Sequence, residues 1–78
     1  MTNKLFTVIA EILEVPSTAI TAQTSAATEK HWDSLRHMQI IFAVEDAFGV
    51  HFRDEEIPLL TSVQAISNAL ASYGANPV

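Results

Sequence analysis

Residues 32–38 read Trp-Asp-Ser-Leu-Arg-His-Met and lie between a long polar stretch and the most apolar helical segment of the chain. Asp33 is expected to cap this helix, because its short carboxylate can accept hydrogen bonds from the unpaired N–H groups of the first turn. Ser34 then occupies the first helical position, where the positive end of the helix dipole favours a phosphate on its hydroxyl. The stretch is therefore either an ordinary helix start or the attachment point of a phosphate-linked group.

The helix that begins there is predicted to cover residues 34–48, with Gly49 as a left-handed C-cap. At about 100° per residue its apolar side chains fall into two groups. The first group is expected to face the core: Ile40, Ile41, Val44 and Phe48.

The second apolar group of this helix lies mostly on the opposite side. Its apolar members are Leu35, Met38 and Phe42. The polar residues interleaved with them are Gln39, Glu45 and Asp46. An apolar patch with a polar rim predicts a face that binds a protein partner, and the two acids suit a basic one. The alternative is a middle helix that is buried on two sides.

The rest of the chain predicts further helices at about residues 3–15, 54–58 and 62–73. Pro16 ends the first, Gly74 ends the last, and Thr61 with Gln64 matches a capping box. The long loop at 17–32 needs anchors, for which Ile20 and Trp32 are the candidates, and one short turn is expected near 17–20. We predict one all-α domain over residues 1–78, a four-helix bundle of three main helices and one short helix.

Composition narrows the functional classes. The chain has 78 residues, a net charge of -5, 49% hydrophobic residues and no cysteine. An acidic chain is a poor partner for nucleic acid or an anionic membrane. Without thiols it can form neither a disulfide framework nor a thiolate metal site. No targeting segment or membrane span is predicted, and a cytoplasmic protein is expected.

Enzymatic and metal sites are not indicated. His31, Asp33 and Ser34 are too close in sequence for a catalytic triad, whose groups usually come from separate elements, and no glycine-rich oxyanion loop follows. His37 and His51 do not combine with His31 into metal-ligand spacing. We expect no enzyme and no metal site.

Four stretches together resemble an acyl carrier protein: Trp-Asp-Ser-Leu at 32–35, Glu-Asp-Ala-Phe-Gly-Val at 45–50, Phe-Arg-Asp-Glu-Glu-Ile at 52–57 and Thr-Ser-Val-Gln-Ala-Ile at 61–66. The similarity extends over the whole chain in length, element order and charge. It implies a bundle that carries 4′-phosphopantetheine on a serine, and the matching serine is Ser34.

The resemblance also implies partners. These are a phosphopantetheinyl transferase and enzymes that load and process the acyl group, such as a ligase, a ketosynthase or an acyltransferase. The carrier itself is expected to be a monomer without catalytic activity. Its recognition surface would be the helix after the serine, which includes the second apolar group together with Arg36.

The chain departs from carriers of primary fatty acid synthesis at three positions, namely Trp32, Arg36 and His37. These departures suggest a specialised pathway, such as polyketide, fatty-acid-like or other secondary metabolism. Arg36 and His37 are the residues expected to mark its partners. A stand-alone peptidyl or aminoacyl carrier is the nearest alternative, and a helical adaptor without modification is a more distant one.

Overall fold

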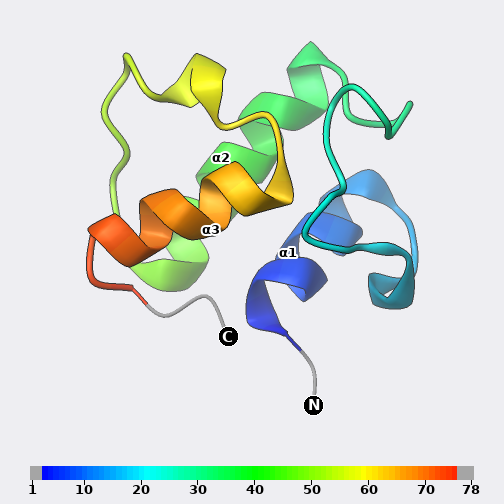
Figure 1. Ribbon diagram of the computed structural model, residues 1–78, viewed down its shortest axis with the longest axis horizontal. Helices are drawn as coiled ribbons and strands as arrows, with labels where there is room; N and C mark the ends of the chain where they lie inside the picture. The colour runs from blue at the N-terminus through cyan, green and yellow to red at the C-terminus, as the bar shows by residue number, and fades with distance from the viewer. Residues whose placement is uncertain (1–2, 76–78) are drawn as a thin grey trace.

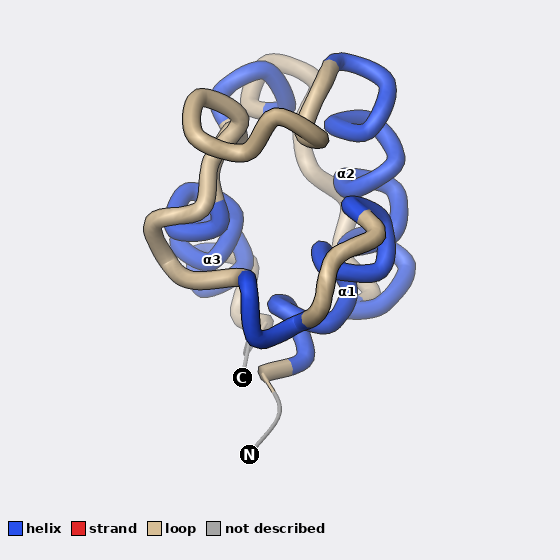
Figure 2. Tube along the Cα trace, turned by 90° about the vertical axis from the view of Figure 1, so that its right-hand side faces the viewer, coloured by secondary structure: helices blue, strands red, loops and turns tan. Residues whose placement is uncertain are grey.

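The computed structural model describes residues 3–75, which form an all-α fold, as predicted. Within this described range there are three α-helices, α1 (Lys4–Leu13), α2 (Ser34–Phe48) and α3 (Val63–Ser72), and two short 3-10 helices, η1 (Ser17–Ala19) and η2 (Ile57–Leu59). Figure 1 shows η2 and the start of α2 at the same end of the molecule. Figure 2 shows α3 on one side of the bundle and α1 with α2 on the other.

The first helix is shorter than the predicted range of 3–15. Asn3 caps α1 by accepting a hydrogen bond from the backbone N–H of Phe6 at 3.2 Å. The helix ends at Glu14, which adopts a left-handed conformation with φ 58°. Lys4 then links α1 to the end of α2, because its Nζ lies 2.7 Å from the carbonyl oxygen of Ala47.

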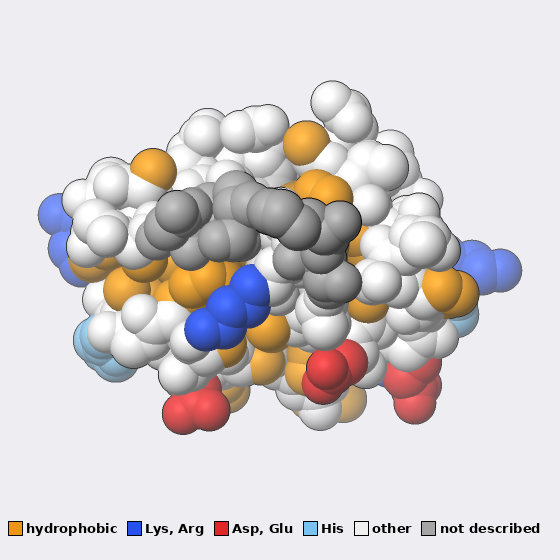
Figure 3. Space-filling model, turned by 90° about the horizontal axis from the view of Figure 1, so that it is seen from below, with side chains coloured by type: hydrophobic (Ala, Val, Ile, Leu, Met, Phe, Trp, Pro, Cys, Tyr) orange, Lys and Arg blue, Asp and Glu red, His pale blue; other side chains and the backbone are white. Residues whose placement is uncertain are grey.

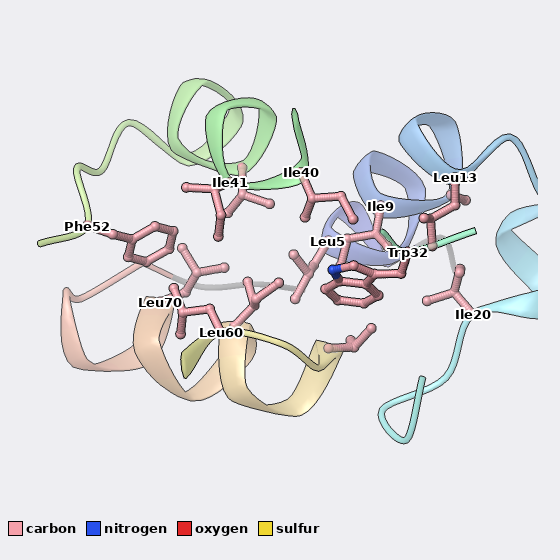
Figure 4. Packing of buried hydrophobic residues seen from close by; sticks show 14 residues of the cluster. Leu5, Ile9, Leu13, Ile20, Trp32, Ile40, Ile41, Phe52, Leu60 and Leu70 are labelled. Atoms are coloured by element: carbon pink, nitrogen blue, oxygen red, sulfur yellow. The ribbon is translucent and has the colours of Figure 1, made fainter. Parts of the chain in front are cut away.

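The core contains fourteen buried apolar residues, with no polar or charged side chain buried among the residues described. Ile20 and Trp32 belong to it at 3% exposure each, so both predicted anchors of the first loop are confirmed. Figure 4 shows the Trp32 indole among side chains of α1, with Ile20 at the far end of the same row. A large buried aromatic side chain therefore fixes the end of the loop immediately before α2.

Backbone pairing also holds the first loop against the start of α3. The N–H of Ala26 donates to the carbonyl of Thr61 at 2.8 Å, and the N–H of Val63 donates to that of Thr24 at 2.9 Å. Inside the loop, the Thr24 hydroxyl accepts from the N–H of Thr21 at 2.9 Å. These bonds, together with the two apolar anchors, explain how the sixteen residues 17–32 remain ordered without a long helix of their own.

Two local predictions after α2 were wrong. The short helix expected at 54–58 is a turn followed by η2, since Pro58 lacks the N–H that a longer helix would need. The N-cap of α3 is Ser62, whose hydroxyl accepts from the N–H of Ala65 at 3.0 Å. Thr61 lies one residue before this cap, and its carbonyl accepts from the N–H of Ala26 in the first loop.

Candidate functional site

The first turn of α2 has the capped geometry expected from the sequence. Asp33 is extended, and its Oδ1 accepts a hydrogen bond from the backbone N–H of Arg36 at 2.8 Å. Its carbonyl accepts from the N–H of His37 at 2.8 Å. Ser34 is the first helical residue and is exposed. Its hydroxyl is therefore accessible at the end of a 15-residue helix whose dipole favours negative charge.

A groove of about 550 Å³ opens beside Ser34, and we call it the Ser34 groove. One wall comes from the end of the first loop and the start of α2, and the other comes from η2 and the segments around it. Its lining residues are Ala26, Trp32, Asp33, Ser34, His37, Met38, Ile57, Pro58 and Thr61. Trp32, Met38 and Ile57 therefore give this groove apolar surface close to Ser34.

His37 connects the two walls of the Ser34 groove. Trp32 Nε1 donates to His37 Nδ1 at 3.0 Å, and His37 Nε2 lies 2.8 Å from the carbonyl oxygen of Ile57. The two rings are stacked at an angle of 25°. Sequence reasoning assigned His37 to partner choice and missed this internal role. The spacing of five residues between Trp32 and His37 was the available signal.

The predicted partner face of α2 separates into exposed and partly buried residues. Leu35 and Phe42 are 69% and 59% exposed, which leaves two large apolar side chains in contact with water. Gln39 and Asp46 are also exposed. Met38 is partly buried and lines the Ser34 groove. The alternative of a helix buried on two sides does not hold for Leu35 and Phe42.

Glu45 was expected on the partner face, but it holds the next segment of the chain. Its side chain is only 14% exposed, and Oε2 accepts a hydrogen bond from the N–H of Phe52 at 2.8 Å. His51 Nδ1 lies 3.5 Å from the same oxygen. The carboxylate faces the backbone after α2 because Gly49 reverses the chain there with φ 66°.

Arg36 is likewise held within the bundle. Its guanidinium donates to the carbonyl of Ile12 at 2.7 Å and lies 3.1 Å from Glu14 Oε2. The side chain is 28% exposed. Arg36 is thus occupied with the end of α1, and this engagement argues against its use as a partner-reading residue.

The surface is chemically mixed elsewhere. Figure 3 shows hydrophobic side chains exposed between separated acidic and basic ones.

Within residues 3–75, no three His, Asp or Glu side chains are grouped so that they could hold a metal ion. In the same part of the chain, none of the helices has the length and apolar character needed to span a bilayer.

The chain is similar in sequence to several known proteins that share one description. The chain is 33% identical over 71 residues to the acyl carrier protein of Buchnera aphidicola subsp. Baizongia pistaciae, covering 91% of each chain. It is 36% identical over 72 residues to acyl carrier protein 3 of Ralstonia nicotianae, covering 87% of this chain and 83% of the relative. The chain belongs to the acyl carrier protein family. A third relative, the acyl carrier protein of Thermosynechococcus vestitus, is 33% identical over 64 residues, covering 82% of this chain and 79% of its own.

Protein-family models gave no match to this acyl carrier protein. Its membership therefore rests on the full-length relatives and agrees with the all-α fold. Family members act as carriers rather than catalysts, which is consistent with a site that offers an exposed hydroxyl and a groove.

Proposed function

We propose that this acyl carrier protein tethers acyl groups as thioesters on 4′-phosphopantetheine attached to the hydroxyl of Ser34. The observation that carries the proposal is the exposed Ser34 at the capped start of α2, directly beside a groove. Bound there, the prosthetic group supplies the thiol that this cysteine-free chain lacks.

The residues around Ser34 fit a phosphodiester at this position. The Asp33 carboxylate accepts a hydrogen bond from the N–H of Arg36 and so stabilises the first turn of α2. The helix dipole stabilises negative charge at this end of α2 by about 0.3–1 kcal/mol. Because the groove starts at the same residue, an acyl group on the arm has apolar surface within reach.

The partners in this proposal are a phosphopantetheinyl transferase and the enzymes that load and process the acyl group. They would contact the exposed side of α2, where Leu35 and Phe42 provide apolar surface and Asp46 provides a negative charge. Gln39 lies between them and can exchange hydrogen bonds with a partner. The protein acts as a cytoplasmic monomer that presents cargo and performs no chemistry of its own.

The pathway in this proposal is a specialised one, of polyketide, fatty-acid-like or other secondary metabolism. Two of the three sequence differences that suggested this pathway no longer support it, because Arg36 and His37 have partners within the bundle. Trp32 is the remaining difference from carriers of primary fatty acid synthesis. An aminoacyl or peptidyl cargo is the alternative, and comparing acyl-loading with aminoacyl-loading enzymes on the modified protein separates the two.

Intact mass spectrometry tests the attachment. Coexpression with a broad-specificity phosphopantetheinyl transferase should add the mass of one phosphopantetheinyl group. Ser34→Ala should abolish the gain, while Ser17→Ala, at another exposed serine, should not. An unmodified wild type, under conditions that modify a reference carrier, would favour the adaptor alternative, in which Ser34→Ala still binds its partner.

A further inference from the structure

The two ring nitrogens of His37 join three segments of the chain. Trp32 Nε1 donates to Nδ1 at 3.0 Å, and Nε2 lies 2.8 Å from the carbonyl oxygen of Ile57. An indole N–H can only donate, so Nδ1 must be the acceptor and the ring proton lies on Nε2. We call this connection the Trp32–His37–Ile57 bridge. It requires a neutral His37 ring.

The bridge spans the turn that contains Ser34. Trp32 lies two residues before Ser34, and His37 lies three residues after it. Within this span the Asp33 carboxylate accepts from the N–H of Arg36, and the Asp33 carbonyl accepts from the N–H of His37, each at 2.8 Å. Trp32 is 3% exposed, and Figure 4 shows its indole among core side chains. The cap therefore holds the backbone of the turn, whereas the bridge ties that turn to the core and to η2.

Protonation of His37 breaks one half of the bridge. An imidazolium ring has two N–H donors and no acceptor, so its Nδ1–H would face the N–H of Trp32. The indole N–H of this buried residue then loses its acceptor, which changes an equilibrium by about 5- to 150-fold. Geometry thus fixes the direction of the effect: the bridge is intact while His37 is neutral and is lost when the ring takes up a proton.

We propose that His37 is a positioning residue for Ser34. While neutral, it fixes the first turn of α2 in the orientation from which the Ser34 hydroxyl is presented to the transferase, and protonation loosens that turn. The inference deepens the proposed function and rests on it for the reaction. Because His37 bonds to Trp32 and Ile57, it acts through the turn and contacts none of the reacting atoms.

The reaction depends on the direction in which the Ser34 oxygen points. Ser34 Oγ forms a bond to the phosphorus that bears pantetheine in coenzyme A, and the bond from that phosphorus to the diphosphate oxygen breaks. The nucleotide leaves with this oxygen, and the hydroxyl proton passes to a base of the transferase. Attack and departure are roughly in line, so a turn that is held in place raises the fraction of productive encounters.

Other charged groups near His37 are exposed or bonded elsewhere. Asp33 is the only other titratable residue that lines the Ser34 groove, and its carboxylate caps α2. The first loop, α2 and the segment before η2 contribute six more, namely Glu29, Lys30, His31, Arg36, Glu55 and Glu56. None of the ion pairs among the described residues includes His37. The bridge is therefore the interaction that its protonation changes directly.

A spectroscopic test uses a background with one histidine. His31→Gln and His51→Gln replace the other two histidines, both exposed, and Trp32 is the single tryptophan. In NMR spectra the indole N–H signal should move with the same midpoint as the ring protons of His37 when pH is lowered. His37→Gln keeps an acceptor and a donor, so in that variant the indole signal should not follow a histidine titration.

Transfer to Ser34 is measured in competition, with two variants, coenzyme A and a transferase in one tube and the products resolved by intact mass. Both variants share the same enzyme, so its own dependence on pH cancels. At about pH 8, His37→Ala should be modified at least about threefold more slowly than His37→Gln. The protein with His37 should match the Gln variant there and fall behind it as the ring becomes protonated.

Two results would overturn the inference. One is equal transfer to the folded Ala and Gln variants of His37, and the other is an indole signal that does not follow the His37 ring. If His37→Ala does not fold, Trp32→Phe replaces it, because this change removes the same bond and keeps a buried aromatic ring. Equal transfer to Trp32→Phe and the wild type would then be decisive. No mass gain in any variant would instead overturn the attachment at Ser34, and this inference with it.

Discussion

The guanidinium of Arg36 donates a hydrogen bond of 2.7 Å to the carbonyl oxygen of Ile12, which lies 24 residues earlier in the chain. Ile12 is in the last turn of α1, where helix carbonyls have no partner within the helix. The same guanidinium lies 3.1 Å from Glu14 Oε2. Arg36 therefore joins the end of α1 to the first turn of α2.

Arg36→Met should lower the free energy of unfolding by about 1–2 kcal/mol, because a charge-assisted hydrogen bond to a helix carbonyl is lost. The exposed ion pair with Glu14 adds little to this figure. Urea unfolding measures the loss. Gln39→Ala, an exposed change one turn further on, should stay within about 0.5 kcal/mol. Equal stabilities of the two variants would show that the contact with Ile12 contributes nothing.

Glu45 and Asp46 should respond differently although they are neighbours. Glu45→Ala should cost about 1–3 kcal/mol, since the partly buried N–H of Phe52 loses its acceptor. Hydrogen exchange of the Phe52 amide should accelerate at the same time. Asp46→Ala, at an exposed position, should stay within about 0.5 kcal/mol. A protected Phe52 amide in Glu45→Ala would contradict this role.

Phe42 and Phe52 make a similar matched pair. Phe42 is 59% exposed and Phe52 is fully buried. Phe42→Ala should change stability by less than about 1 kcal/mol, whereas Phe52→Ala should cost about 3–5 kcal/mol through the cavity it leaves. Thermal and urea unfolding measure both. If Phe42 belongs to the partner surface, Phe42→Ala also slows loading by partner enzymes; a large loss of stability would place it in the core instead.

The pair Tyr73 and Glu56 predicts a dependence of stability on pH. The hydrogen bond from the Tyr73 hydroxyl, followed by that from the backbone N–H of Arg53, lowers the pKa of Glu56 below its ordinary 4.5. A lowered folded-state pKa stabilises the protein above pH 4.5, and this contribution is lost as pH falls through the folded-state pKa. Accepting the same bond, Glu56 raises the pKa of Tyr73 above 10.0. That contribution is present below pH 10.0 and is lost as pH rises through the folded-state value.

Tyr73→Phe removes the hydroxyl and keeps the edge-on aromatic contact with Phe52. The variant should be less stable than the wild type near neutral pH. The difference should shrink below pH 4.5 and again above pH 10.0, where the wild type loses its own contribution. Unfolding midpoints across a pH series measure this. A difference that stays constant at both extremes would exclude the hydrogen bond as its source.

The sequence alone determined the helical fold and the capped start of α2. Asp33 and Gly49 bound α2 where the pattern predicted, because a cap depends on a side chain and on N–H groups only three residues away. The family likewise followed from stretches whose residues are contiguous. The predicted N-cap of the last helix, Thr61, was wrong. The cap of α3 is Ser62, and the carbonyl of Thr61 instead pairs with Ala26 in the distant first loop.

Only the tertiary structure decided which side chains of α2 are available to partners. Arg36, His37 and Glu45 read as surface residues, yet each satisfies a backbone group on another segment, and those groups lie 24, 20 and 7 residues away. Helical periodicity places a residue on a face but cannot show what lies opposite that face. A buried or partly buried backbone group needs a hydrogen-bond partner, and the partner it finds is set by the way the chain packs.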